Sequence, residues 1–189
     1  MELLIEKTAS TRHNSLFLLK GLLAVLWGIF ALFAAIVPAM VLVYTFGILN
    51  IVASVLTVTY AYRNRHLKIA HEWLLLEAFV ELAAGVVFTF FVHDVSHFLQ
   101  YMSYGVIFVV TLQFIYGFSL LLTNVLHPKN LVARFMSLIA GSLVSVVLLA
   151  NSFGVTWSFI IIGIFSIIYG ILNAQFSLKL RNIILGEAE

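Results

Sequence analysis

Long apolar runs separated by short polar breaks dominate the chain. Six runs reach the roughly 20 residues that a helix needs to cross a hydrocarbon core about 30 Å thick. They lie near residues 16–37, 39–61, 72–92, 100–123, 131–150 and 155–178. The runs lack the period-2 alternation of a barrel strand, so helices are predicted. The pattern predicts an all-α membrane protein with six transmembrane helices, forming a single transmembrane domain over residues 1–189.

The basic residues predict the orientation of these helices. All ten occur in the N-terminal segment, the second and fourth connections, the C-terminal tail or the adjoining helix ends: Lys7, Arg12, Lys20, Arg63, Arg65, Lys68, Lys129, Arg134, Lys179 and Arg181. The first, third and fifth connections contain none. By the positive-inside rule, both termini and the 62–71 connection are expected in the cytoplasm, and residues 93–99 outside.

The first run has a rival interpretation as a cleaved signal peptide, with Val37-Pro38-Ala39 as a loose cleavage site. The run is longer than the 7–15 residues of a signal-peptide core, and removing it would break the even helix count. We therefore expect the first run to be a transmembrane helix.

The composition indicates that lipid, rather than water, surrounds most of the protein. Hydrophobic residues make up 63% of the chain and charged residues 10%, against about 45–50% and 25% in soluble domains. These values exclude a disordered chain and a nucleic-acid partner. The lipid bilayer is the expected partner, together with a second copy or another membrane protein. With no cysteine, thiol catalysis and cysteine-ligated metals are excluded, and neither a cofactor nor a metal is expected.

An internal repeat joins helices into hairpins. Residues 75–85 and 131–141 match at five positions, including a final glycine, and read LLEAFVELAAG and LVARFMSLIAG. Residues 18–28 share leucines and the glycine. Gly28, Gly85 and Gly141 recur at almost equal intervals, and each interval has the length of one helical hairpin. Three parallel repeat units are predicted, at about 14–62, 71–124 and 128–178.

Each odd-numbered predicted helix carries a stripe at i, i+4 and i+8, which is one helical face. The stripes are Lys20-Ala24-Gly28, Glu77-Glu81-Gly85 and Ala133-Ser137-Gly141. Small residues let helix backbones approach closely in lipid. These faces are expected to point inward, and Gly163 and Gly170 predict a similar packing seam on the sixth helix.

On these features the chain resembles the HdeD-like acid-resistance membrane proteins, which are built from a short repeat of unknown function. The resemblance covers roughly residues 14–178 and rests on diffuse patterns of glycine, leucine and aromatic residues. The first unit keeps a proline at its helix end, Pro38, whereas the others have His93-Asp94 and Asn151-Ser152. The resemblance implies a multi-pass bacterial inner-membrane protein linked to acid stress, with no assigned reaction.

Charged residues within the predicted spans are functional candidates because burying a charge in lipid costs about 2.5–3.5 kcal/mol on insertion scales. Lys20 and Glu77 occupy equivalent repeat positions at similar depth, so an intramembrane ion pair is predicted. The alternative is that Lys20 extends to the membrane interface.

Glu81 is expected one turn deeper, where no basic residue lies at its level. Asn50 and Gln113 are predicted as its polar neighbours. Two interpretations stay open. Glu81 is either a neutral carboxyl bonded to an amide, or a proton-binding site whose occupancy changes with pH.

The outward connection reads His93-Asp94-Val95-Ser96-His97. His93 and His97 can share a helical face and gain charge between about pH 5 and 8. Their pattern lacks the glutamate of a zinc-protease helix. An exposed polar loop and a pair of acid-sensing histidines are both consistent with it.

An enzyme is not expected, because Asp94 is the only aspartate and no phosphate-binding loop or nucleophile elbow occurs. The favoured function is a non-enzymatic membrane protein acting through helix packing, partner binding or pH response. The rival is a small proton or solute channel or transporter.

Overall fold

The computed structural model describes residues 2–63, 71–122, 128–150 and 153–185. Within these ranges the prediction of an all-helical chain is confirmed, because six α-helices and no strand are present. The α-helices are α1 (Glu2–Ala31), α2 (Ala39–Arg63), α3 (His71–Val86), α4 (Val95–Leu122), α5 (Pro128–Leu149) and α6 (Val155–Leu185). A π-helical turn, η1 (Val87–Phe91), extends α3.

Four helix ends differ clearly from the apolar runs. The first helix begins at Glu2 and ends at Ala31, α4 begins at Val95, and α6 continues to Leu185. The runs were bounded by hydropathy, whereas a helix is bounded by its backbone hydrogen bonds. These bonds extend α1, α4 and α6 into polar sequence, and in α1 they end at Ala31, before the apolar run does. Consequently His97 lies within the first turn of α4 rather than in the expected 93–99 connection.

Four helices carry apolar stretches long enough to cross a membrane, among the residues described: Ala39–Tyr62, Glu72–Phe91, Val95–Ile115 and Val155–Gln175. Shorter apolar segments occur in α1 and α5, at Leu18–Ala31 and Phe135–Leu149. All six helices expose large apolar side chains, including Leu26, Val55, Phe79, Leu122, Val146 and Trp157. A soluble monomer rarely exposes this much apolar surface, so the bundle is a membrane protein.

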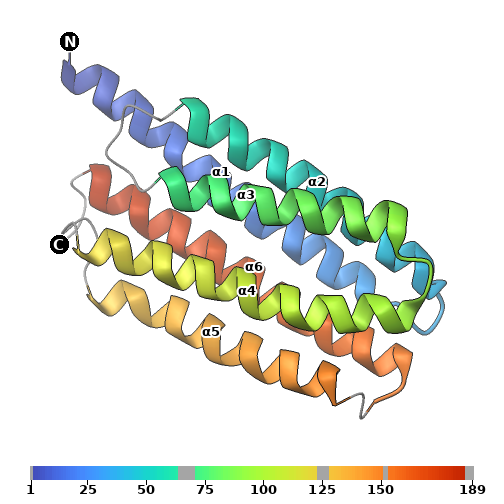
Figure 1. The fold of residues 1–189 in the computed structure, drawn as a ribbon. Coiled ribbons are helices and arrows are strands. Elements are labelled where there is room, and N and C mark those ends of the chain that lie inside the picture. The colour runs from blue at the N-terminus through green and yellow to red at the C-terminus, as the bar shows by residue number, and fades with distance from the viewer. Residues whose placement is uncertain (1, 64–70, 123–127, 151–152, 186–189) are drawn as a thin grey trace.

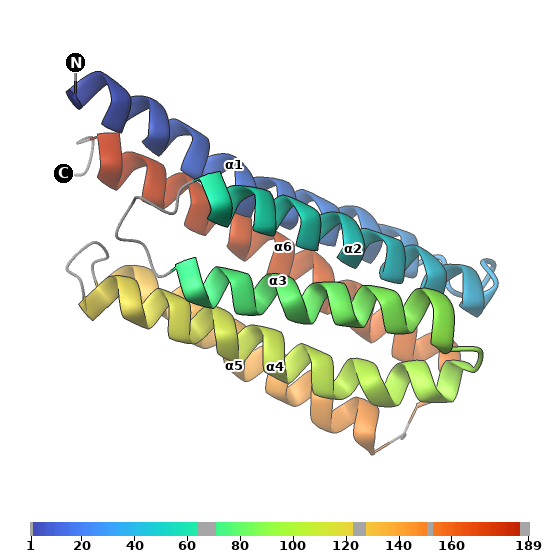
Figure 2. The same ribbon diagram turned by 45° about the horizontal axis from the view of Figure 1, so that its top comes forward.

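The helices pack side by side in an up-and-down bundle, in which α1 begins and α6 ends at the same end (Figures 1 and 2). The closest pairs are α1 with α6, α2 with α3, and α4 with α5. Each pair joins an even-numbered helix to the odd-numbered helix of the next hairpin, and α6 returns to α1. The tightest packing is therefore between the expected hairpins rather than within them.

Glycines allow two of these pairs to approach closely. Gly21 and Gly28 of α1 face Gly170 and Gly163 of α6, and Gly47 of α2 faces Gly85 of α3. Gly141 of α5 packs instead against the side chains of Val106 and Val110 on α4. The glycines predicted from the stripes thus lie at interhelical contacts, and backbone proximity is the main source of van der Waals contact there.

A serine hydroxyl forms a hydrogen bond between the two helices of each close pair. The hydroxyl of Ser54 donates to Ala78 O across α2 and α3 at 2.7 Å, Ser145 donates to Ser103 O across α5 and α4 at 2.6 Å, and Ser166 donates to Ala24 O across α6 and α1 at 2.8 Å. In lipid such bonds stabilise a helix pair because no water competes for the carbonyl.

Aromatic rings fill the bundle near the loop that precedes α4. Phe88 contacts Phe98 with ring centroids 5.0 Å apart, and Phe98 stacks on Phe159 at 5.4 Å. Trp27 lies edge-on to Phe46 at 4.7 Å, and its indole N–H donates to Leu42 O. This aromatic core joins α1, α2, η1, α4 and α6.

We predict that Gly28→Ala destabilises the bundle by about 1–3 kcal/mol, the usual cost of overpacking. An added Cβ would lie 2.6 Å from Gly163 O, so the two helices would have to separate. Gly105→Ala is the matched control, because its Cβ would meet no atom within 4 Å and alanine favours helix by about 0.5–1 kcal/mol. Unfolding in detergent measures both. Equal stability of the Gly28 variant and the parent protein would contradict the packing account.

Candidate functional site

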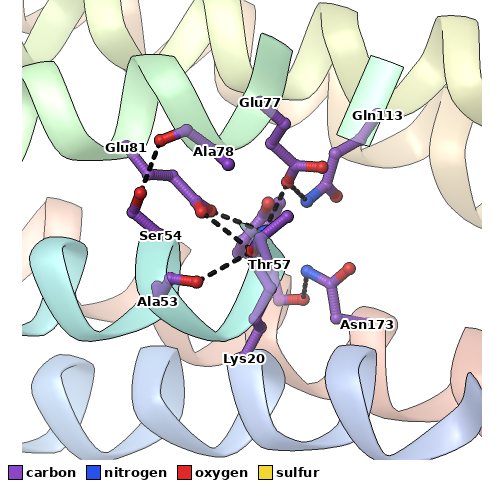
Figure 3. A network of polar contacts seen from close by, with 10 residues as sticks. Lys20, Ala53, Ser54, Thr57, Glu77, Ala78, Glu81, Gln113 and Asn173 are labelled. Atoms are coloured by element: carbon purple, nitrogen blue, oxygen red, sulfur yellow. Dashed lines mark hydrogen bonds and ion pairs between the residues drawn. The ribbon is translucent and has the colours of Figure 1, made fainter. Parts of the chain in front are cut away.

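Two glutamates share one lysine inside the bundle. Lys20 Nζ on α1 lies 2.8 Å from Glu77 Oε1 and 2.6 Å from Glu81 Oε1 on α3. Figure 3 shows the lysine reaching from α1 to both carboxylates. We call these three residues the Lys20 cluster. When all three are ionised, their combined formal charge is −1.

The cluster is deeply buried. Lys20 is 7% exposed, Glu77 2% and Glu81 6%. Charges removed from water are stable only when they are paired and hydrogen-bonded. Since one ammonium must serve two carboxylates, neither receives the full compensation of a one-to-one ion pair.

Polar groups from two further helices complete the cluster. The amide of Gln113 on α4 donates to Glu77 Oε1 at 2.7 Å. The hydroxyl of Thr57 on α2 lies 3.2 Å from Glu81 Oε2, and 2.8 Å from Ala53 O in its own helix. Four helices thus meet at two carboxylates, and Asn173 on α6 lies beside them (Figure 3).

The structure brings together Lys20 and Glu77 as the repeat register predicted. The expectation that no basic residue reaches the level of Glu81 is wrong, because Lys20 binds it directly. That expectation compared Cα depths alone, at a rise of about 1.5 Å for each helical residue. A lysine side chain has four methylenes and spans the turn that separates Glu77 from Glu81.

The two predicted amide neighbours of Glu81 lie elsewhere. Gln113 bonds to Glu77 instead, and the amide nitrogen of Asn50 donates to Phe46 O within α2 at 2.9 Å. The simple pairing of a neutral Glu81 with an amide is therefore not the arrangement observed. Asn50 nevertheless lines the cavity described below.

Thr57 was missed by the sequence analysis, although a signal for it exists. Asn50, Ser54 and Thr57 follow one another at i, i+4 and i+7 along an otherwise apolar helix. This spacing places them on one helical face. The predicted stripes lie on the odd-numbered helices, so they do not include this face of α2.

We predict that Lys20→Met destabilises the bundle by about 3–5 kcal/mol, the usual result of removing one partner of a buried ion pair. Glu77 and Glu81 would then lack their ammonium. Replacing both glutamates with glutamine in the Lys20→Met background should restore about 0.5–2 kcal/mol of stability, because no unpaired charge remains. Unfolding in detergent measures the set. No recovery would show that the three charges do not depend on one another.

A cavity of about 140 Å³ lies beside the cluster, inside the bundle. Lys20, Glu81 and Asn50 line one part of it. The remaining wall is mainly apolar and comes from α1, α2, α3, η1, α4 and α6, with Trp27, Phe46 and Phe165 among the lining residues. The cavity therefore lies directly against the charged groups of Lys20 and Glu81.

The two candidate histidines lie apart from the cluster. His93 is exposed in the short loop before α4, and His97 is exposed on the first turn of that helix. His97 Nδ1 is 3.6 Å from Asp94 Oδ2, and its ring stacks on Tyr101. Among the described residues, no group of three potential metal-binding side chains occurs.

Asp94 caps the start of α4. The hydroxyl of Ser96 donates to Asp94 Oδ2, and the backbone N–H of Phe98 donates to Asp94 O at 3.2 Å. Hydrogen bonds from Ser96, first from its hydroxyl and then from its backbone N–H, hold the pKa of Asp94 below its usual range. His97 makes a smaller electrostatic contribution to that lowering.

We predict that Ser96→Ala raises the pKa of Asp94 toward its usual range. A lowered folded pKa stabilises the fold above the unfolded pKa, and this contribution is lost as the pH falls through the folded value. The ionised Asp94 therefore stabilises the start of α4 down to a lower pH in the parent protein than in the Ser96→Ala variant. Because Asp94 is the sole aspartate, ¹³C-aspartate labelling yields one carboxyl signal to titrate by NMR.

Ser142→Ala is the control for this titration, since that hydroxyl bonds to Leu138 O within α5. It should leave the Asp94 midpoint unchanged. An unchanged midpoint in Ser96→Ala would contradict the assigned role of the Ser96 hydroxyl.

Part of the chain matches a known family. Residues 19–90 match the family described as a short repeat of unknown function, DUF308. This is the repeat family of HdeD-like membrane proteins, so the resemblance seen in the sequence is supported at family level over that range. No curated protein and no solved structure matches the chain.

The DUF308 match covers less than half of the chain, and it runs from α1 through α2 and α3 into η1. Lys20, Thr57, Glu77 and Glu81 all fall within it. Most of the Lys20 cluster and its polar partners therefore lie in the part of the chain that resembles the family.

Proposed function

We propose that the protein is a six-span inner-membrane protein of a bacterium, with both termini in the cytoplasm. The common end of α1 and α6 supports an even number of crossings (Figure 1). The basic residues of the sequence gather at the termini and the second and fourth connections, as the positive-inside rule requires of cytoplasmic segments. The shorter apolar segments of α1 and α5 cross within the bundle, supported by α6 and α4.

The proposed role is non-enzymatic and of the HdeD-like acid-resistance type, in which the Lys20 cluster binds a proton and the bundle responds. The observation that carries it is one buried lysine shared by two carboxylates. With one carboxyl protonated, the formal charge of the three residues changes from −1 to zero. The cluster therefore has two charge states that differ by one proton.

Among the described residues, the charged or titratable groups that interact with Glu81 or with its lysine come from three helices. Lys20 comes from α1, Glu77 from α3 itself, and Tyr169 from α6, where it interacts electrostatically with Lys20. From α2 the uncharged Thr57 lies against Glu81, and from α4 the uncharged Gln113 lies against Glu77. Protonating Glu81 weakens its attraction to Lys20, which links α1 to α3. The change in this contact then alters the packing of the bundle, or its contact with a membrane partner or a second copy on its exposed faces.

An acid-survival assay tests this role. In a bacterial strain lacking the gene, Glu81→Gln should fail to restore survival, because glutamine can neither gain nor lose the proton. Glu72→Gln is the matched control, an exposed position on α3, and it should restore survival like the parent protein. Both variants must reach the membrane in equal amounts. Equal protection by Glu81→Gln and the parent protein would refute the proposal.

The cavity favours a second candidate, a small channel or transporter for protons or a small solute. Glu81 lines this cavity between the helices. Purified protein in liposomes distinguishes the two functions. Proton or solute flux that is abolished by Glu81→Gln would favour transport, whereas absence of flux alongside acid protection would favour the pH-responsive role.

A further inference from the structure

The cavity beside the Lys20 cluster has the features of an amphiphile site. Its accessible volume, about 140 Å³, is close to that of an engineered cavity of about 150 Å³ that holds benzene. One six-membered ring with a short substituent is therefore an appropriate size for an occupant. The aromatic side chains of Trp27, Phe46 and Phe88 contribute to its wall.

The polar part of the cavity favours a cation. Glu81 and Lys20 both line it, and Lys20 is shared between Glu81 and Glu77, so the three residues together keep a formal charge of −1. The negative charge of Glu81 is therefore only partly compensated by Lys20. One N–H of the Asn50 amide donates to Phe46 O, so Asn50 can offer a ligand its amide oxygen, an acceptor, as well as its second N–H.

Other ligand classes fit this site less well. An anion would approach a cluster whose combined formal charge is −1, in a space of low polarity. A hard metal ion needs several oxygen ligands, and the described residues contain no group of three potential metal-binding side chains. An organic ammonium is complementary to both parts of the cavity. Its positive charge is attracted by Glu81, and its apolar body can pack against the aromatic walls, which also attract cations.

We propose that this cavity binds a small protonated monoamine of the size of benzylamine, with its ammonium against Glu81 and its ring against the aromatic wall. The inference rests on the same charge cluster as the proposed function. It adds a ligand class that the pH-responsive role does not require.

Benzylamine and benzyl alcohol provide matched probes, because they share the ring and differ in charge. Binding to the purified protein in lipid nanodiscs is measured by calorimetry, with empty nanodiscs subtracted to remove partitioning into lipid. We expect benzylamine to bind at least about tenfold more tightly than benzyl alcohol, which corresponds to about 1.4 kcal/mol. Equal affinities would overturn the assignment of a cation site.

Two variants locate the site. Gly105→Leu should weaken benzylamine binding at least about tenfold, since Gly105 lines the cavity and a Cβ there meets no atom within 4 Å. Glu81→Gln should reduce benzylamine binding toward the level of benzyl alcohol. Ile107→Phe, at an exposed position of the same helix as Gly105, should bind like the parent protein.

Undiminished binding by Gly105→Leu would place the amine outside the cavity, and undiminished binding by Glu81→Gln would exclude the carboxylate as its partner. Either result overturns the inference. The acid-survival assay measures survival without added amine, so a failure here leaves that result intact. Conversely, amine binding without acid protection would refute the pH-responsive role alone.

Discussion

The sharing of Lys20 between Glu77 and Glu81 is the constraint on which the interior of this bundle depends. Three charged side chains lie where water is scarce, and each is stable there because the others are present. Gln113 and Thr57 extend this dependence to α4 and α2. Under the proposed function, a change in one proton at the cluster acts on the contacts of four helices.

Close backbone packing makes this arrangement possible. The glycine contacts of α1 with α6 and of α2 with α3 bring these helices near one another. Lys20 can then reach α3 from α1, although the tight partner of α1 is α6. Small residues thus determine the distance between backbones, and long polar side chains bridge the gaps that remain. The cavity beside Glu81 is such a gap.

Sequence patterns predicted the helices and part of the site. The apolar runs predicted the all-helical chain, and the equivalent repeat positions of Lys20 and Glu77 placed the two at one level. The pairing of α6 with α1 joins segments at opposite ends of the chain, and no local pattern specifies it. Gly47 was overlooked because even-numbered helices were not compared, although Gly47, Gly105 and Gly163 recur at equal intervals. The Lys20 contact with Glu81 depends on side-chain reach, which backbone depth does not describe.

Magic-angle-spinning NMR of the protein in lipid tests the shared lysine most directly. With ¹⁵N-lysine and ¹³C-glutamate labels, Lys20 Nζ should show dipolar contacts to two carboxyl carbons, consistent with N–O distances of 2.8 and 2.6 Å. Glu77→Gln and Glu81→Gln should each remove one contact and so assign the pair. A Lys20 nitrogen in contact with one carboxyl, or with water alone, would contradict the account.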